Sequence, residues 1–83
     1  MSNTIIHGLS IFYEKDGLYK IRATIRSGNV HNGQILSYTT PGGAHYCLTV
    51  KELRDGPGRH MTLIVEGDSE AIGNYKGGYY LSD

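Results

Sequence analysis

The residues best suited to metal chemistry lie in the second half of this chain. His45 and Cys47 are two residues apart, so on an extended strand their side chains would share a face. A hairpin with the following strand would set Glu66 opposite Cys47 and Asp68 opposite His45. Imidazole, thiolate and carboxylate groups all bind zinc. His45 and Cys47 are therefore weak metal candidates, but no CxxC, HxH or HExxH motif accompanies them. We expect ordinary cross-strand polar pairing here, with no metal or cofactor.

Cys47 could alternatively serve as a nucleophile, which requires an imidazole within hydrogen-bond distance. His45 is too far along an extended strand for direct proton transfer, and His7 and His60 are distant in sequence. The glycine-containing segments 28–33 and 73–78 lack the spacing of phosphate-binding loops. These observations predict a protein that is not an enzyme.

Nucleic-acid recognition has a candidate surface near the N-terminus. A hairpin closed around residues 15–17 would carry an aromatic ring and three cations on its outer face: Phe12, Lys20, Arg22 and Arg26. Cations interleaved with a ring can contact a phosphate backbone and stack on bases. The alternative is a solvated face whose charges keep the strand soluble. Zero net charge weakens long-range attraction to phosphates.

Tyrosine is the other unusual feature, with seven tyrosines against one phenylalanine and no tryptophan. Three of them, Tyr75, Tyr79 and Tyr80, lie among glycines near the C-terminus. An apolar ring with a polar tip suits contact surfaces, so these residues could anchor a partner. In the alternative interpretation, the segment is a last strand that closes the sheet, with glycines at the bend.

The elements that position these residues are predicted to be short strands. Twelve glycines interrupt runs rich in Ile, Tyr, Thr and Val, and turn signals separate six candidate strands. The strands span about 5–14, 18–27, 34–40, 44–53, 59–67 and 71–81. Segment 44–53 also fits a helix, although its Thr and Val favour a strand. Residues 68–70 could begin one short helical turn.

Alternating apolar residues predict the register of two hairpins. The first pairs Tyr13 with Tyr19, Ile11 with Ile21 and Leu9 with Ala23 on one face, and Phe12 with Lys20 and Ser10 with Arg22 on the other. The second pairs Leu48 with Val65 and Val50 with Leu63. It also leaves Glu52 opposite Met61 on the apolar face. At the turn, it places Arg54 opposite Arg59. Each register collects most apolar residues on one side, as a sheet with one buried face requires.

The sequence thus predicts a single all-β domain over residues 1–83: a six-stranded antiparallel meander that forms a small barrel or a two-layer sandwich. The two hairpins align with each other, so a duplicated three-strand unit is one explanation and shared turn chemistry is another.

Composition narrows the function further. One cysteine excludes an intramolecular disulfide and favours a cytoplasmic location, and the N-terminal residues predict neither a signal peptide nor a membrane span. Residues 1–40 carry a net charge of +2 and residues 41–83 one of −2. We expect a binding or regulatory module that acts through protein–protein contacts and self-associates as a homodimer. The alternatives are a small nucleic-acid-binding domain and a small-ligand binder with a tyrosine-lined pocket.

Overall fold

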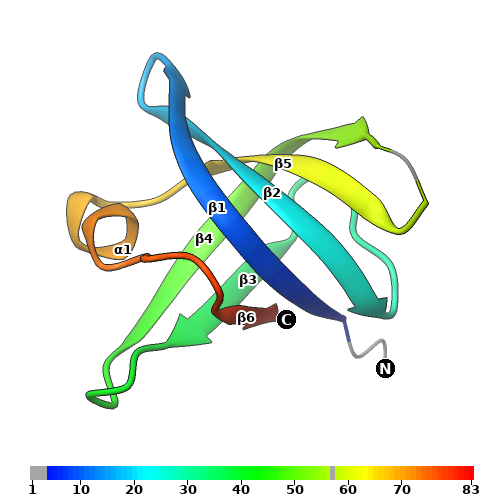
Figure 1. Ribbon diagram of the computed structural model, residues 1–83. Coiled ribbons are helices and arrows are strands. Elements are labelled where there is room, and N and C mark those ends of the chain that lie inside the picture. Colours follow the sequence, from blue (N-terminus) through cyan, green and yellow to red (C-terminus); the bar gives the residue numbers. More distant parts are fainter. Residues whose placement is uncertain (1–3, 57) are drawn as a thin grey trace.

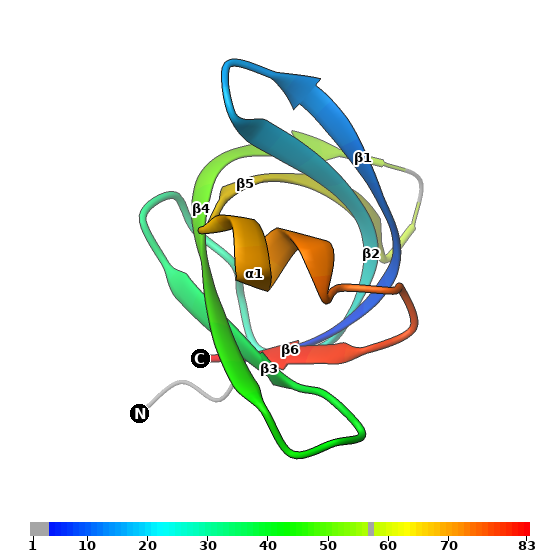
Figure 2. The same cartoon turned by 90° about the vertical axis from the view of Figure 1, so that its left-hand side faces the viewer.

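A computed structural model of the chain describes residues 4–56 and 58–83. Six antiparallel strands form a closed barrel, and one short helix lies across an end of it (Figures 1 and 2). The elements are β1 (Ile5–Lys15), β2 (Leu18–Ser27), β3 (Ile35–Thr39), β4 (His45–Asp55), β5 (His60–Glu66), α1 (Ser69–Gly73) and β6 (Tyr80–Ser82). The all-β prediction is confirmed, in its barrel form, and segment 44–53 is a strand. Among the described residues, no helix is long and apolar enough to cross a membrane.

The order of strands around the barrel is β1-β2-β5-β4-β3-β6. Strands β1 and β2 are therefore adjacent in both sequence and space, and so are β3, β4 and β5. Strand β2 lies beside β5, and β6 closes the barrel between β3 and β1. Exchanging β1 with β4, β2 with β5 and β3 with β6 leaves every pair of neighbouring strands in the list. The topology is thus compatible with the duplicated three-strand unit that the sequence suggested.

The first hairpin keeps most of its predicted register. Tyr13 pairs with Tyr19 and Ile11 with Ile21. The turn has two residues, Asp16 and Gly17, with φ of 50° and 77°, rather than the expected three. Positive φ at both central positions matches the right-handed twist of the flanking strands.

A β-bulge at Leu9 changes the register of this hairpin at the end away from the turn. Gly8, not Leu9, lies opposite Ala23, so that predicted pair is wrong. The extra residue reverses the alternation. Gly8 is consequently buried, and Leu9 is 46% exposed.

The predicted register of the second hairpin is wrong by two residues up to Val50 and by three beyond it. Val50 lies opposite Val65, and beyond a bulge after Val50, Leu53 lies opposite Leu63 and Arg54 opposite Thr62. The bulge places Leu53 toward the core and leaves Glu52 exposed opposite Ile64. It therefore removes the carboxylate that the predicted register had left on the apolar face.

The barrel interior holds aliphatic side chains from all six strands together with aromatic rings. Tyr38 on β3 is 2% exposed, and its hydroxyl donates a hydrogen bond to the carbonyl of Ala71 in α1. Tyr75, which follows α1, is 3% exposed. Its hydroxyl has no hydrogen-bond partner among the described residues. The rings of Tyr75 and Tyr38 meet edge to face, with centroids 5.2 Å apart.

These buried phenols predict loss of stability at alkaline pH. Burial, and after it the phenols of Tyr46 and Tyr79, raises the pKa of Tyr38 to about 12, and burial raises the pKa of Tyr75 as well. Unfolded tyrosine has a pKa of about 10. The unfolded chain therefore loses protons first, and the stabilisation, complete below about pH 10, is lost as the pH rises toward about 12. Urea unfolding midpoints measured across this interval should fall steadily.

A Tyr75→Phe variant is the matched control for this prediction, because it removes one of the two buried phenols. Its midpoint should fall less steeply with pH than that of the wild type. Identical slopes would show that Tyr75 does not contribute to the pH dependence.

A polar cluster joins Thr4, Gln34 and Asp83, and no pattern in the sequence predicted it. The backbone nitrogen of Thr4 donates to Asp83 Oδ1 at 2.9 Å, and Gln34 Nε2 donates to Asp83 Oδ2 at 3.1 Å. Thr4 Oγ1 donates to the carbonyl of Asn29 at 2.7 Å. Thr4 and Gln34 are both buried, so these bonds satisfy polar groups that would otherwise be costly to bury.

Candidate functional site

The outer face of β1, β2 and β5 assembles most of the basic surface that the sequence predicted. Phe12 lies opposite Lys20, and Ser10 opposite Arg22, as expected. Strand β5 continues this face, with Thr62 opposite Arg22 and His60 opposite Thr24. Phe12 is 53% exposed. We call the surface formed by these seven residues, together with Arg26 and Arg59 near the end of β2, the basic face.

Arg26 lies further along β2, near the end of the strand, and is exposed. It is accompanied there by Arg59, which the sequence analysis did not select. Arg59 Nε donates to the carbonyl of Ile25 at 3.0 Å, and its Nη2 donates to that of Arg26 at 3.3 Å. These bonds hold a fourth cation beside β2, at the Arg26 end of the basic face.

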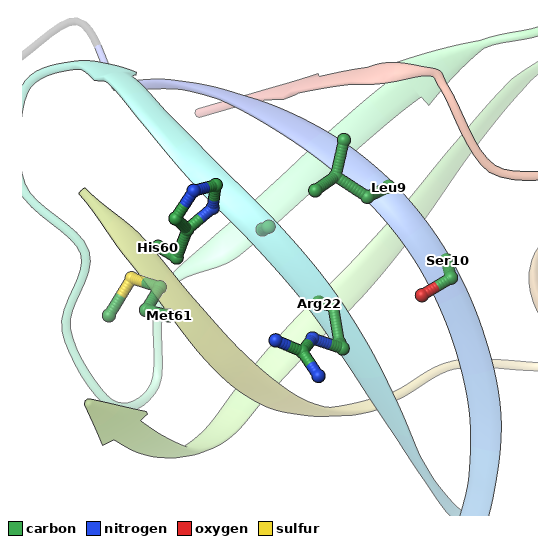
Figure 3. A pocket seen from close by; sticks show the side chains of 6 residues that line it. Leu9, Ser10, Arg22, His60 and Met61 are labelled. Carbon is green, nitrogen blue, oxygen red and sulfur yellow. The ribbon is translucent and has the colours of Figure 1, made fainter. Parts of the chain in front are cut away.

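A hollow of about 290 Å³ lies within the basic face. It is lined by Leu9, Ser10, Arg22, Ala23, His60 and Met61. Figure 3 shows Leu9 and Ser10 on β1, Arg22 on the adjacent β2, and His60 and Met61 on β5. The bulge contributes directly, because it exposes the apolar side chain of Leu9, which lines the same hollow as Arg22. We call this hollow the Arg22 groove.

The cations of the basic face have no ion pairs within the described part of the chain. The three salt bridges found there join Lys51 to Glu66, and Arg54 to Glu14 and Glu52. None of them involves Lys20, Arg22, Arg26 or Arg59. The imidazole of His60 is held by a contact between its Nδ1 and Thr24 Oγ1, 3.1 Å apart. No carboxylate of the described residues therefore pairs with these four cations.

The three C-terminal tyrosines do not form the contact surface that the sequence suggested. Tyr75 is buried, so the expectation that it contacts a partner is wrong. Tyr79 is half-buried, and its ring stacks on Tyr38 with centroids 5.4 Å apart. Tyr80 alone of the three is exposed, at 55%, and its ring stacks on His7 at 4.8 Å.

The local backbone conformation explains why the alternating faces predicted for the strand at 71–81 are not observed. The expected strand 71–81 is instead the end of α1, then an irregular stretch, and the three residues of β6. Asp68 begins α1 as its N-cap, accepting a hydrogen bond from the backbone nitrogen of Ala71, which confirms the short helical turn. Gly77 and Gly78 have φ of 86° and 77°, a conformation that side chains other than glycine rarely adopt.

The proposed ligands around Cys47 are not brought together. Cys47 lies opposite Ser37 rather than Glu66, and His45 Nδ1 lies 2.8 Å from Thr39 Oγ1. Asp68 caps α1 instead of facing His45. No cluster of three or more metal-ligating side chains is present within residues 4–56 and 58–83. The register slip is the cause, since Glu66 lies opposite Thr49.

The imidazoles considered as partners of Cys47 make other contacts. His45 contacts Thr39, His60 contacts Thr24, and His7 stacks on Tyr80. None of these contacts reaches the Cys47 thiol, which is exposed. The geometry thus offers no thiolate–imidazole pair for nucleophilic catalysis among the described residues.

Comparison with known proteins identifies no relative. No family model, curated protein or solved structure matches the chain.

Proposed function

We propose that this chain is a non-enzymatic binding module that engages an acidic protein surface through its basic face. The observation that carries the proposal is the Arg22 groove, where a guanidinium with no carboxylate partner in the described residues lies beside the exposed side chain of Leu9. Arginine and methionine, which both line this groove, are enriched in protein–protein interfaces.

The groove could make both an apolar contact and an ionic contact with such a partner. An apolar side chain of the partner would displace water from Leu9 and Met61, and a neighbouring carboxylate would accept hydrogen bonds from Arg22. Lys20, Arg26 and Arg59 lie around the groove and would speed association through long-range attraction. Such a contact needs acidic and apolar groups close together on the partner.

Nucleic acid is the second candidate, since the same cations could contact phosphates. The geometry favours it less, because Phe12 is the one exposed large aromatic side chain on the basic face within the described residues. Binding to single strands uses successive stacked rings. A tyrosine-lined ligand pocket gains no support, because Tyr38, Tyr75 and Tyr79 pack against one another in the core.

Charge reversal at Arg22 tests the proposal. The partner captured by the wild-type protein from its native extract should be identified and its affinity measured by calorimetry. Arg22→Glu should weaken binding by at least about tenfold, equivalent to about 1.4 kcal/mol. The matched control is Lys76→Glu, an exposed lysine that is not among the residues lining the Arg22 groove and that undergoes the same change in charge. It should bind like the wild type.

Two outcomes would overturn this function. Equal weakening by Arg22→Glu and Lys76→Glu would show that only total charge matters. Loss of the captured material on nuclease treatment, with a steep dependence of affinity on salt, would assign the basic face to nucleic acid instead.

A further inference from the structure

Strand β1 has an edge that the barrel leaves unpaired. It pairs with β2 through Lys15, but β6 runs beside it only at residues 5–7. Gly8 extends this side by backbone hydrogen bonds with Tyr79 and Gly78. From Ser10 to Lys15, no described strand lies on the side away from β2, and Figure 1 shows this end of the hairpin projecting from the barrel. Unpaired backbone groups along an edge are a template for another strand.

The side chains on this edge are apolar and exposed. Leu9, Phe12 and Tyr13 are 46%, 53% and 63% exposed, and they account for half of the large exposed hydrophobic side chains in the described residues. Phe12 and Tyr13 are consecutive on the strand, so they point to opposite faces of the sheet. An added strand would therefore bury apolar surface on both faces.

The edge of β4 beyond Thr49 is also incompletely paired, but it is protected. Strand β3 pairs with β4 through Thr49, and loop residues Gly33 and Gln34 bond to Val50. The rest of β4 carries Lys51, Glu52 and Arg54, each in a salt bridge. Charged residues and bulges on an edge oppose strand addition. No charged residue occurs between positions 9 and 13 of β1.

We propose that two copies of this chain associate through antiparallel pairing of their β1 edges, about a two-fold axis at Phe12. A two-fold interface requires a self-complementary patch, and β1 meets this requirement. With Phe12 opposite its counterpart, Ile11 lies opposite the partner's Tyr13, and Ser10 opposite the partner's Glu14. Gly77 lies against the carbonyl of Leu9, so the pairing ends at Ser10. No like charges face each other, and the central pairs are aromatic or aliphatic, which favours cross-strand contact.

This pairing goes beyond the proposed function and does not depend on it. The axis of an antiparallel strand pair is perpendicular to the sheet, so both copies of the basic face would lie on the same side. The dimer would thus present two Arg22 grooves to a partner, and binding both would raise the overall affinity without any new contact.

Charge placed on the axis tests the pairing without a known ligand. Native mass spectrometry across a concentration series should show a wild-type dimer. Phe12→Lys puts two ammonium groups opposite each other and should raise the dimer dissociation constant at least about tenfold. Ile35→Lys is the matched control, because Ile35 is a 60% exposed residue on β3. It should leave the dimer intact.

Mixing two variants separates a lost interface from a lost fold. Phe12→Lys and Phe12→Glu should each be monomeric and together form a heterodimer, because opposite charges then meet on the axis. A wild-type chain that stays monomeric throughout the series, or a dimer indifferent to Phe12→Lys, would overturn the proposal. Failure of the mixture to associate would also overturn it.

A cross-link tests the register directly. In a Cys47→Ser background, Phe12→Cys places two thiols opposite each other, at a Cβ separation of roughly 5 Å that a disulfide can bridge with a small adjustment. Mild oxidation should convert this variant to a covalent dimer and leave the Ile35→Cys variant monomeric. Cross-linking of Ile35→Cys in preference would place the interface on β3 and refute the β1 pairing.

Discussion

Replacing Gly8 with alanine is expected to destabilise the barrel by about 3 kcal/mol, the upper end of the usual range for overpacking. A Cβ at this position would overlap the Tyr75 hydroxyl oxygen and lie 2.9 Å from its ring carbon Cζ. The ring cannot easily move aside, because it is 3% exposed and meets Tyr38 and Tyr79 edge to face. Urea denaturation of the two proteins would measure the loss.

The hydroxyl of Tyr75 supplies the control for this steric argument. Because that hydroxyl is buried without a hydrogen-bond partner among the described residues, Tyr75→Phe should be neutral or slightly stabilising. Combined with Gly8→Ala, it should recover part of the lost stability, giving a coupling energy of at least about 0.5 kcal/mol. Strictly additive effects, or a Gly8→Ala variant as stable as the wild type, would refute the close contact.

Truncation of Ile21 to alanine should cost about 2–4 kcal/mol. Ile21 is fully buried at the middle of β2, opposite Ile11 on one side and Leu63 on the other. Its removal leaves a cavity between three strands. The matched change is Ile35→Ala on β3, where the same side chain is 60% exposed.

The difference between these two isoleucine variants is the informative quantity. Ile35→Ala should cost less than about 1 kcal/mol, since exposed substitutions seldom have large effects. Equal losses in the two variants would show that β2 does not face the core as described. Thermal melting monitored by circular dichroism is sufficient to rank them.

The bulge at Leu9 links the fold to both proposals. It exposes the Leu9 side chain beside Arg22, which creates the apolar part of the groove. It also lies where the pairing of β1 on the β6 side ends, so the strand beyond it is free to accept another. A single inserted residue therefore contributes both to the proposed binding surface and to the proposed pairing edge.

Several features of this protein follow from the sequence alone. Glycine-rich turn signals and β-branched residues predicted the all-β fold and, with small errors at their ends, five of the six strands. The sixth expected strand, 71–81, is short because α1 and an irregular stretch occupy most of it. Alternation in β1 and β2 placed Phe12, Lys20 and Arg22 on one face, since side chains of a strand repeat every two residues. These are local properties of a few neighbouring residues.

Only the tertiary structure decided the remaining features. Whether a strand accommodates a bulge depends on which side chains its neighbours bring to the core, and that moved Leu9 outward and Leu53 inward. The burial of Tyr75 depends on the space that Gly8 leaves 67 positions earlier in the sequence. The position of β5 beside β2 added His60 and Arg59 to the basic face and Met61 to the Arg22 groove. Such contacts join residues distant along the chain, and no local pattern encodes them.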